Sequence, residues 1–157
     1  MSDESDKAAA SIRPATPADL DAVCEIVSEA YGIYIPRMGV EPGPMRADYA
    51  ALIGDGVLHV AEIEGSVAGI LVILAEPDHL LLDNVAVDPD RQGSGIGRAL
   101  IAFAEAAART AGHAEIRLYT HEKMVENQRL YAALGYEETG RGRQDGFDRV
   151  FLRKRLA

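Results

Sequence analysis

The sequence predicts a single α+β domain with one mixed sheet of about seven strands and about four flanking helices. Three observations support this class. The chain has 157 residues, of which 48% are apolar, and this suits one hydrophobic core. Three strand-like segments follow one another with very short connections, which only antiparallel neighbours can make. Helical and strand-like segments then alternate toward the C-terminus.

Residues 1–10 are expected to form a disordered tail, because they are acidic and alanine-rich and offer little apolar surface to bury. The folded domain is then 11–157, and it opens with a short extended segment, 11–13. Thr16 and Asp19 follow at the spacing of a helix N-cap and its reciprocal acid. A first helix is therefore expected to begin there.

This first helix should end near Gly32, where the helical spacing of apolar side chains stops. Prolines and glycines break the next stretch, and a second short helix is expected over 45–53. The third strand-like segment is apolar on both faces except at Asp83 and Asn84, so it should be a central strand whose two polar residues need an explanation. The three expected strands are 57–63, 67–74 and 80–87.

The C-terminal half is expected to hold two helices and three strands. A glycine-rich turn from Gln92 to Gly97 leads into a helix that Gly112 closes. The elements expected after it are a strand over 115–119, a helix over 126–134, and two strands over 136–143 and 147–156 around a turn at Asp145-Gly146.

Composition limits the partners and the compartment. The net charge of -9 argues against a nucleic-acid partner and against an anionic membrane surface, since both attract clustered Lys and Arg. A single cysteine, Cys24, cannot form an internal disulfide, and no apolar run approaches a membrane span of roughly 18 residues. These features predict a cytoplasmic protein. The four histidines are scattered without ligand spacing, so no metal is expected.

The glycine-rich turn between a buried strand and a helix predicts an anion site, because backbone amides and the helix N-terminus converge there. Its spacing separates the candidate ligands. A nucleotide P-loop needs Gly-Lys followed by Ser or Thr, whereas Gly97 precedes Arg98 and Ala99. The third glycine of a dinucleotide fingerprint would fall on Arg98. The pattern thus disfavours a kinase and a nicotinamide enzyme.

Two motifs resemble the landmarks of the GCN5-related N-acetyltransferase (GNAT) family. They are Gln92-x-x-Gly95-x-Gly97, preceded by Val85-Ala86-Val87-Asp88-Pro89, and Glu126-Asn127-x-x-Leu130-Tyr131-x-x-Leu134-Gly135-Tyr136. The resemblance implies acetyl-CoA as co-substrate, no metal, and a V-shaped opening between two parallel central strands, here those ending at Val87 and Tyr119.

The resemblance also implies the contacts of the coenzyme. The turn would hold the pyrophosphate, and the central strand would bond the pantetheine arm through its backbone, with help from a polar side chain at Asn127. The implied coenzyme-binding residues are Val85, Ala86, Val87, Gln92, Gly93, Ser94, Gly95, Ile96, Gly97, Arg98 and Asn127.

The resemblance assigns Tyr131 as the acid that protonates the departing sulfur, and backbone amides near Val85 and Ala86 as donors to the thioester carbonyl. Tyr131 lies four residues after Asn127, so both share a helix face. A half-buried core aromatic would show the same pattern at Tyr131.

The base is less determined by the sequence. Asp83 is the first candidate, because it interrupts an apolar strand just before the expected acetyl position, although a structural carboxylate is an equal alternative. His121 is the second, and water is the third.

The acceptor is expected to meet Tyr31, Tyr34 and Arg37, although core packing and surface charge explain these residues equally well. The predicted function is acetyl-CoA-dependent acetylation of a primary amine of a small molecule or peptide. The alternative is a catalytically inactive acyl-CoA-binding regulatory module. The last two strands offer an edge through which a homodimer could form.

Overall fold

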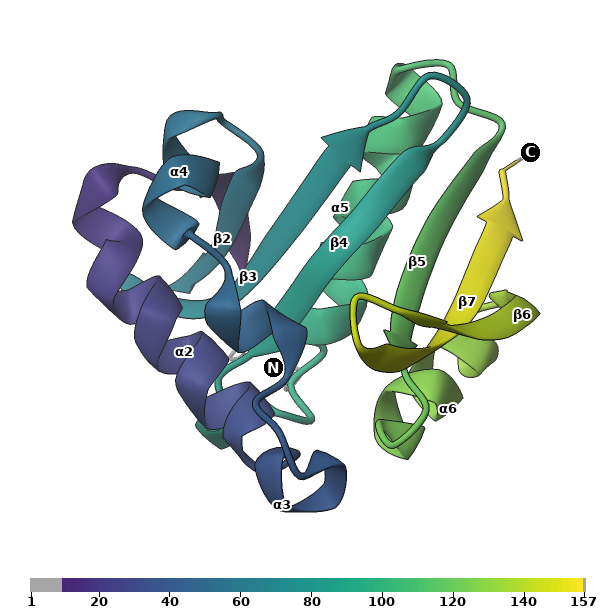
Figure 1. Cartoon of the computed structure of the whole chain (residues 1–157). Coiled ribbons are helices and arrows are strands. Elements are labelled where there is room, and N and C mark those ends of the chain that lie inside the picture. Colours follow the sequence, from purple (N-terminus) through teal and green to yellow (C-terminus); the bar gives the residue numbers. More distant parts are fainter. Residues whose placement is uncertain (1–9, 157) are drawn as a thin grey trace, which may run out of the picture.

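The computed structural model describes residues 10–156, which form one sheet of seven strands with helices on both faces (Figure 1). The strand order is β1-β2-β3-β4-β5-β7-β6, and every neighbouring pair is antiparallel except β4 and β5. The expected α+β class and mixed sheet are confirmed, whereas the predicted tail falls almost wholly outside the described residues. The strands are β1 (Ser11–Pro14), β2 (Leu58–Ile63), β3 (Ser66–Ala75), β4 (Leu80–Val87), β5 (Glu115–His121), β6 (Glu137–Gln144) and β7 (Phe147–Arg155).

Five α-helices accompany the sheet: α2 (Leu20–Gly32), α3 (Ile35–Met38), α4 (Tyr49–Gly54), α5 (Ile96–Thr110) and α6 (Val125–Ala133). Three short 3-10 turns are η1 (Pro17–Asp19), η2 (Gly43–Arg46) and η3 (Pro89–Arg91). α2 and α4 cover one face of the sheet and α5 the other (Figure 1). The sequence did not predict α3, because Pro36 breaks a helix interior but is compatible with a first turn. The second short helix, expected over 45–53, is divided between η2 and α4.

The helical N-terminus expected at Thr16 is present. The Thr16 amide donates to the Asp19 carboxylate at 2.8 Å, and the Asp19 amide returns a bond to the Thr16 carbonyl at 2.9 Å. Arg13 on β1 also pairs with Asp19 at 2.8 Å. This ion pair, together with the Thr16 bonds, lowers the pKa of Asp19 to about 2.

The core lies on both faces of the sheet, because successive strand side chains alternate between them. Side chains that include Leu71, Leu82, Leu100, Ile101 and Ile116 pack between the sheet and α5. Others, including Val23, Val27, Leu58, Ile70 and Val72, pack between the sheet and α2 with α4.

Gly69 on β3 allows α5 to approach the sheet closely. A Cβ at this position would lie 3.0 Å from side-chain atoms of Ile96 and Leu100 and 3.2 Å from the Ala86 carbonyl oxygen. The N-terminal turn of α5 therefore rests directly on the backbone of the sheet.

The parallel ladder between β4 and β5 is short. Only residues 80–82 of β4 pair with residues 116–118 of β5, and beyond them each strand has its other neighbour alone. Asp83 is an extra residue in β4, since Val72 faces Asn84 while the next residue, Ile73, faces Leu82. The two strands diverge after this bulge (Figure 1), as expected for a V-shaped opening.

The C-terminal hairpin of β6 and β7 has the predicted turn, with Asp145 at φ 54° and Gly146 at φ 84°. It places β6 at the free edge of the sheet and β7 beside β5. The hairpin thus forms one wall of the opening, although it lies far from β4 in sequence.

Candidate functional site

Two pockets open where β4 and β5 diverge. The larger holds about 650 Å³ and follows the end of β4 and the glycine turn toward α6. It is lined by Ala30, Tyr31, Ile33, Tyr34, Val85, Ala86, Val87, Arg91, Gln92, Gly93, Ser94, Gly95, Ile96, Gly97, Arg98, Glu126, Asn127, Leu130 and Tyr131. Every residue that the sequence predicted to contact the coenzyme borders this pocket.

The glycine turn has the backbone of an anion site. Gly93 and Gly95 adopt φ of 86° and 87°, which side-chain-bearing residues rarely adopt. The first bond of α5 runs from the Ala99 amide to the Gly95 carbonyl at 3.0 Å. The amides of 95–98 precede that bond, so the helix leaves them without partners and directs them toward the pocket.

Two arginines add positive charge to this end of the larger pocket. Arg91 closes η3 and Arg98 lies in the first turn of α5. Within residues 10–156, neither has an acidic partner within 4.0 Å. Sequence reasoning missed Arg91, although its position directly before Gln92 was a usable signal.

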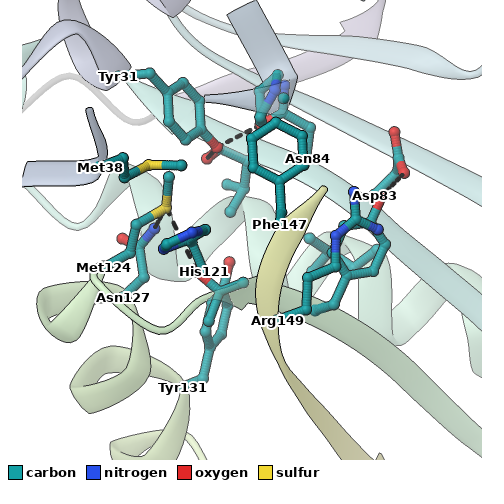
Figure 2. Close-up of a pocket in the computed structure, with 16 residues that line it drawn as sticks. Tyr31, Met38, Asp83, Asn84, His121, Met124, Asn127, Tyr131, Phe147 and Arg149 are labelled. Carbon is teal, nitrogen blue, oxygen red and sulfur yellow. Dashed lines mark hydrogen bonds between the residues drawn. The ribbon is translucent and has the colours of Figure 1, made fainter. Parts of the chain in front are cut away.

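The smaller pocket, of about 60 Å³, opens at the bulge in β4, and Figure 2 shows the residues that line it. Asp83, Phe147 and Arg149 group on one side of it, and Tyr131 and Asn127 come from α6 on the other (Figure 2). Its lining comprises Tyr31, Met38, Gly43, Pro44, Leu82, Asp83, Asn84, Val85, Tyr119, Thr120, His121, Met124, Asn127, Tyr131, Phe147 and Arg149.

The two pockets meet at four residues that border both: Tyr31, Val85, Asn127 and Tyr131. Val85 follows the end of the β4–β5 ladder, so its backbone has a strand partner only on the β3 side. A group carried along the larger pocket can therefore reach a second molecule in the smaller pocket beside Val85 and Tyr131.

Tyr131 is held rigidly at this junction. Its side chain is buried, and its ring packs edge-on against Tyr136 with centroids 5.7 Å apart. The Tyr136 hydroxyl donates to Glu105 at 2.9 Å, and Lys154 pairs with the same carboxylate at 3.1 Å. Burial raises the pKa of Tyr131, so its hydroxyl stays protonated at neutral pH. No described residue forms a hydrogen bond with this hydroxyl.

Asn127 begins the face of α6 that meets both pockets. Its side-chain amide donates weakly to the sulfur of buried Met124 at 3.7 Å, and Thr120 donates to the same sulfur at 3.6 Å. These long bonds to sulfur leave the amide able to bind a stronger acceptor.

Asp83 lines the smaller pocket at the bulge of β4. The Tyr119 hydroxyl donates to its Oδ1 at 3.2 Å. Burial raises the pKa of Asp83, although the Tyr119 bond and the charge of Arg149 oppose the shift. Its hydrogen-bond partner is thus a side chain of β5, across the opening.

His121 ends β5 and also borders the smaller pocket. Its Nδ1 accepts the Lys123 amide at 3.1 Å, so a neutral ring carries its proton on Nε2. Burial lowers the pKa of His121, which favours that neutral form. In this arrangement neither ring nitrogen offers a free lone pair.

Asn84 is a buried polar residue in an apolar strand, and its side-chain hydrogen bonds connect three other segments. Tyr31 on α2 donates to the Asn84 side-chain oxygen at 2.5 Å, and Asn84 donates to the Tyr49 hydroxyl of α4 at 2.9 Å. Tyr49 in turn donates to the carbonyl of Pro44 in η2. All three side chains are buried, so this network holds the segment that closes the smaller pocket.

The three residues expected to contact an acceptor separate in the structure. Tyr31 borders both pockets, and Tyr34 borders only the larger one. Arg37 borders neither: it makes two bonds to Glu126 on α6, at 2.7 and 2.8 Å, and lies over the Tyr34 ring at 5.1 Å. These bonds lower the pKa of Glu126 to about 2. Arg37 thus connects α3 to α6 across the opening.

The walls of the smaller pocket include side chains that sequence reasoning missed, notably Met38, Phe147 and Arg149. Phe147 and Arg149 stand near the start of β7, and Gly43 lies against the Phe147 ring. No sequence pattern indicated Phe147 and Arg149, because their place depends on β7 pairing with β5.

Within the part of the chain that the structure describes, no helix is long and apolar enough to cross a membrane. The same residues contain no group of three or more His, Cys, Asp or Glu side chains placed to hold a metal ion.

Comparison with known proteins agrees with this geometry. A family model described as an acetyltransferase (GNAT) domain matches residues 54–138. The aminoglycoside N(6')-acetyltransferase type 1 of Stenotrophomonas maltophilia is 29% identical over 147 residues, which cover 85% of this chain and 90% of that protein.

Solved structures share the fold. PaiA N-acetyltransferase from Thermoplasma acidophilum, in complex with coenzyme A, has a TM-score of 0.78 and 18% identity, covering 94% of this chain and 99% of that one. The ribosomal-protein-S18-alanine N-acetyltransferase from Escherichia coli has a TM-score of 0.75 and 23% identity, covering 94% of both chains. At such identities the likeness concerns the fold.

The Asn84 network can be tested by comparing two buried tyrosines. Tyr49→Phe leaves the Asn84 amide and the Pro44 carbonyl without a partner, so we expect the free energy of unfolding to fall by about 1–3 kcal/mol. Tyr34→Phe is the matched control, because no described residue bonds its hydroxyl, and it should change stability by less than about 0.5 kcal/mol. Urea unfolding followed by circular dichroism measures both. Equal losses in the two variants would contradict the role of the network.

Proposed function

The chain belongs to the GNAT family of N-acetyltransferases, and we propose that it moves an acetyl group from acetyl-CoA directly to a primary amine of a small molecule or peptide. The observation that carries the proposal is the meeting of an anion-binding groove and a separate small pocket at Val85 and Tyr131. The names of two similar proteins, an aminoglycoside N(6')-acetyltransferase and a ribosomal-protein-S18-alanine N-acetyltransferase, support an amine acceptor.

The larger pocket fits the coenzyme by its chemistry. The free amides of 95–98 would hold the pyrophosphate, and Arg91 and Arg98 would neutralise phosphate charge. The end of β4, which lacks a partner on the β5 side, would bond the pantetheine arm, with the Asn127 amide beside it. The acetyl group would then lie at the junction of the pockets.

The proposed reaction removes two protons from the acceptor ammonium and gives one to the sulfur. The ammonium loses its first proton to Asp83, and the nitrogen lone pair forms a bond to the thioester carbonyl carbon. The carbon–sulfur bond breaks, and the thiolate, with a reference pKa of about 8.5, takes a proton from Tyr131. The nitrogen then gives its second proton to the Tyr131 oxygen as the amide forms, and Asp83 releases the first proton to solvent. Backbone amides near Val85 and Ala86 would stabilise negative charge on the carbonyl oxygen.

Asp83 is proposed as the base in preference to His121. Its Oδ2 accepts no hydrogen bond from a described residue, whereas His121 accepts the Lys123 amide with the nitrogen that would have to receive the proton. Water is the third candidate for the base, and the pH–rate profiles of Asp83→Asn and His121→Ala distinguish the three.

We also propose a cytoplasmic location, supported by the single cysteine of the sequence. A homodimer through β6 is supported by the position of that strand at the free edge of the sheet.

Coenzyme binding and turnover test the proposal together. Acetyl-CoA and free CoA at about one hundred times their dissociation constant should each stabilise the fold by roughly 2.7 kcal/mol, whereas ATP and NAD should not. Differential scanning fluorimetry measures the shift, and a thiol reagent then measures free CoA released across a panel of amines. Binding without amine-dependent thiol release would favour the inactive acyl-CoA-binding module. The absence of any CoA shift would refute both readings.

Tyr131→Phe should lower kcat by about tenfold to a thousandfold while leaving the CoA-induced thermal shift in place, because only the proton donor is lost. Tyr136→Phe is the matched control: it loses a structural bond to Glu105, so stability should fall while kcat changes little. Unchanged turnover in Tyr131→Phe would remove that residue from the mechanism.

The acid limb of the pH–rate profile reports the base. Asp83 must be ionised to accept a proton, so activity should be full above its raised pKa and should fall as the pH drops through it. Asp83→Asn should lower kcat/KM and abolish that limb, and His121→Ala should keep it. If both variants retain the wild-type profile, neither residue is the base and water takes the proton.

A further inference from the structure

We infer that the acceptor is a free amino acid, with its amine directed to Asp83 and Val85 and its carboxylate bound by Arg149. The inference rests on the proposed function and names the acceptor class of the same site. It follows from the charge, the burial and the aromatic surroundings of Arg149 in the smaller pocket.

Arg149 is a largely buried cation in the pocket wall. Its side chain is 12% exposed, and its guanidinium carbon lies 4.0 Å from the Tyr119 ring centroid and 5.8 Å from that of Phe147. Figure 2 shows Arg149 beside Phe147, and Arg149 lines the same pocket as Asp83. Stacking covers a face of the guanidinium and leaves its N–H edge for hydrogen bonds.

The protein gives this cation little counter-charge. Its described hydrogen bond goes to the neutral side chain of Gln144 at 2.8 Å. The nearest acid in the described chain is Asp145, 3.9 Å away and 77% exposed, which is a weak and screened contact. A buried cation is costly when it lacks a close anion, so a carboxylate in the pocket would complete its surroundings.

The charge pattern of the pocket matches an amine and a carboxylate on one small molecule. Asp83 accepts the Tyr119 hydroxyl at 3.2 Å, while Arg149 covers the face of the same ring at 4.0 Å. Asp83 and Arg149 are thus one aromatic ring apart, yet they do not form an ion pair within 4.0 Å. His121 also faces the pocket, and burial favours its neutral form. Opposite charges at this spacing suit a zwitterion.

The small size of the pocket favours a free amino acid over a peptide. Its volume is about 60 Å³, and Gly43 and Pro44 of η2 line it beside Phe147. Arg46 lies over the outer face of that ring at 5.6 Å, with Glu41 3.7 Å away.

The test compares acceptors that differ only in the carboxylate. L-Phenylalanine is paired with phenethylamine, L-leucine with isopentylamine, and each amino acid with its amide. We expect kcat/KM to be at least about tenfold higher for the carboxylate member of a pair. The amide is a sharp comparison, because its lower amine pKa would make it the faster substrate for an enzyme indifferent to the carboxylate.

Variants assign the preference to Arg149. Arg149→Gln should lower the ratio within each pair by about tenfold, so that the amide becomes at least as good a substrate as its amino acid, and Arg149→Lys should keep part of the preference, since a charge without the planar fork remains. Arg143→Gln is the matched control: it removes an exposed arginine of the same hairpin, paired with Asp148 at 3.1 Å, and should keep the full ratio. The CoA-induced thermal shift verifies that each variant is folded.

The outcomes separate this inference from the proposed function. Turnover of amines with no carboxylate preference, or a preference that survives in Arg149→Gln, would overturn the inference and leave the acetyltransferase proposal intact. A peptide such as L-phenylalanyl-glycine with a higher kcat/KM than every free amino acid would also overturn it. CoA binding without turnover of any acceptor would overturn the proposed function, and this inference with it.

Discussion

The parallel ladder between β4 and β5 ends after three residue pairs, and both pockets depend on that early end. The bulge at Asp83 shifts the register of β4 against β3 and coincides with the divergence from β5. The same few residues thus lose a strand partner, present a carboxylate and border the junction of the pockets. Had pairing continued along both strands, hydrogen bonds between them would have filled the space in which a thioester and an amine must meet.

Because β4 and β5 separate, other contacts must hold the two sides of the opening in place. Buried polar groups make several of these contacts. Asn84 connects α2, α4 and η2 on one arm of the opening, and Glu105 connects α5, the α6–β6 connection and β7 through Tyr136 and Lys154 on the other. The pair of Arg37 and Glu126 spans the two arms. Because these contacts are directional, they fix the relative positions of the arms more narrowly than apolar packing alone.

Sequence reasoning reached the groove more completely than the small pocket, for a physical reason. The groove is built from one continuous segment around the glycine turn, and local spacing reveals its amides. The small pocket takes Met38, Asp83 and Arg149 from α3, β4 and β7, so it exists only once the long-range strand order is known. Strand boundaries were close to those observed because short turns, such as Asp145-Gly146, separate neighbouring strands. The helix α3 was not predicted, because a proline in the first turn of a helix resembles a proline in a loop.

Gly69 extends the functional constraint to a residue that borders neither pocket. Any side chain there would press on Ile96, Leu100 and the Ala86 carbonyl, and thereby on the turn of α5 that carries the free amides. Every single-base change of a glycine codon that alters the amino acid introduces a larger residue or a stop. No single-base change at this codon therefore replaces Gly69 with a residue that fits. A library selected for coenzyme affinity should lose substitutions at position 69 as strongly as substitutions in the glycine turn.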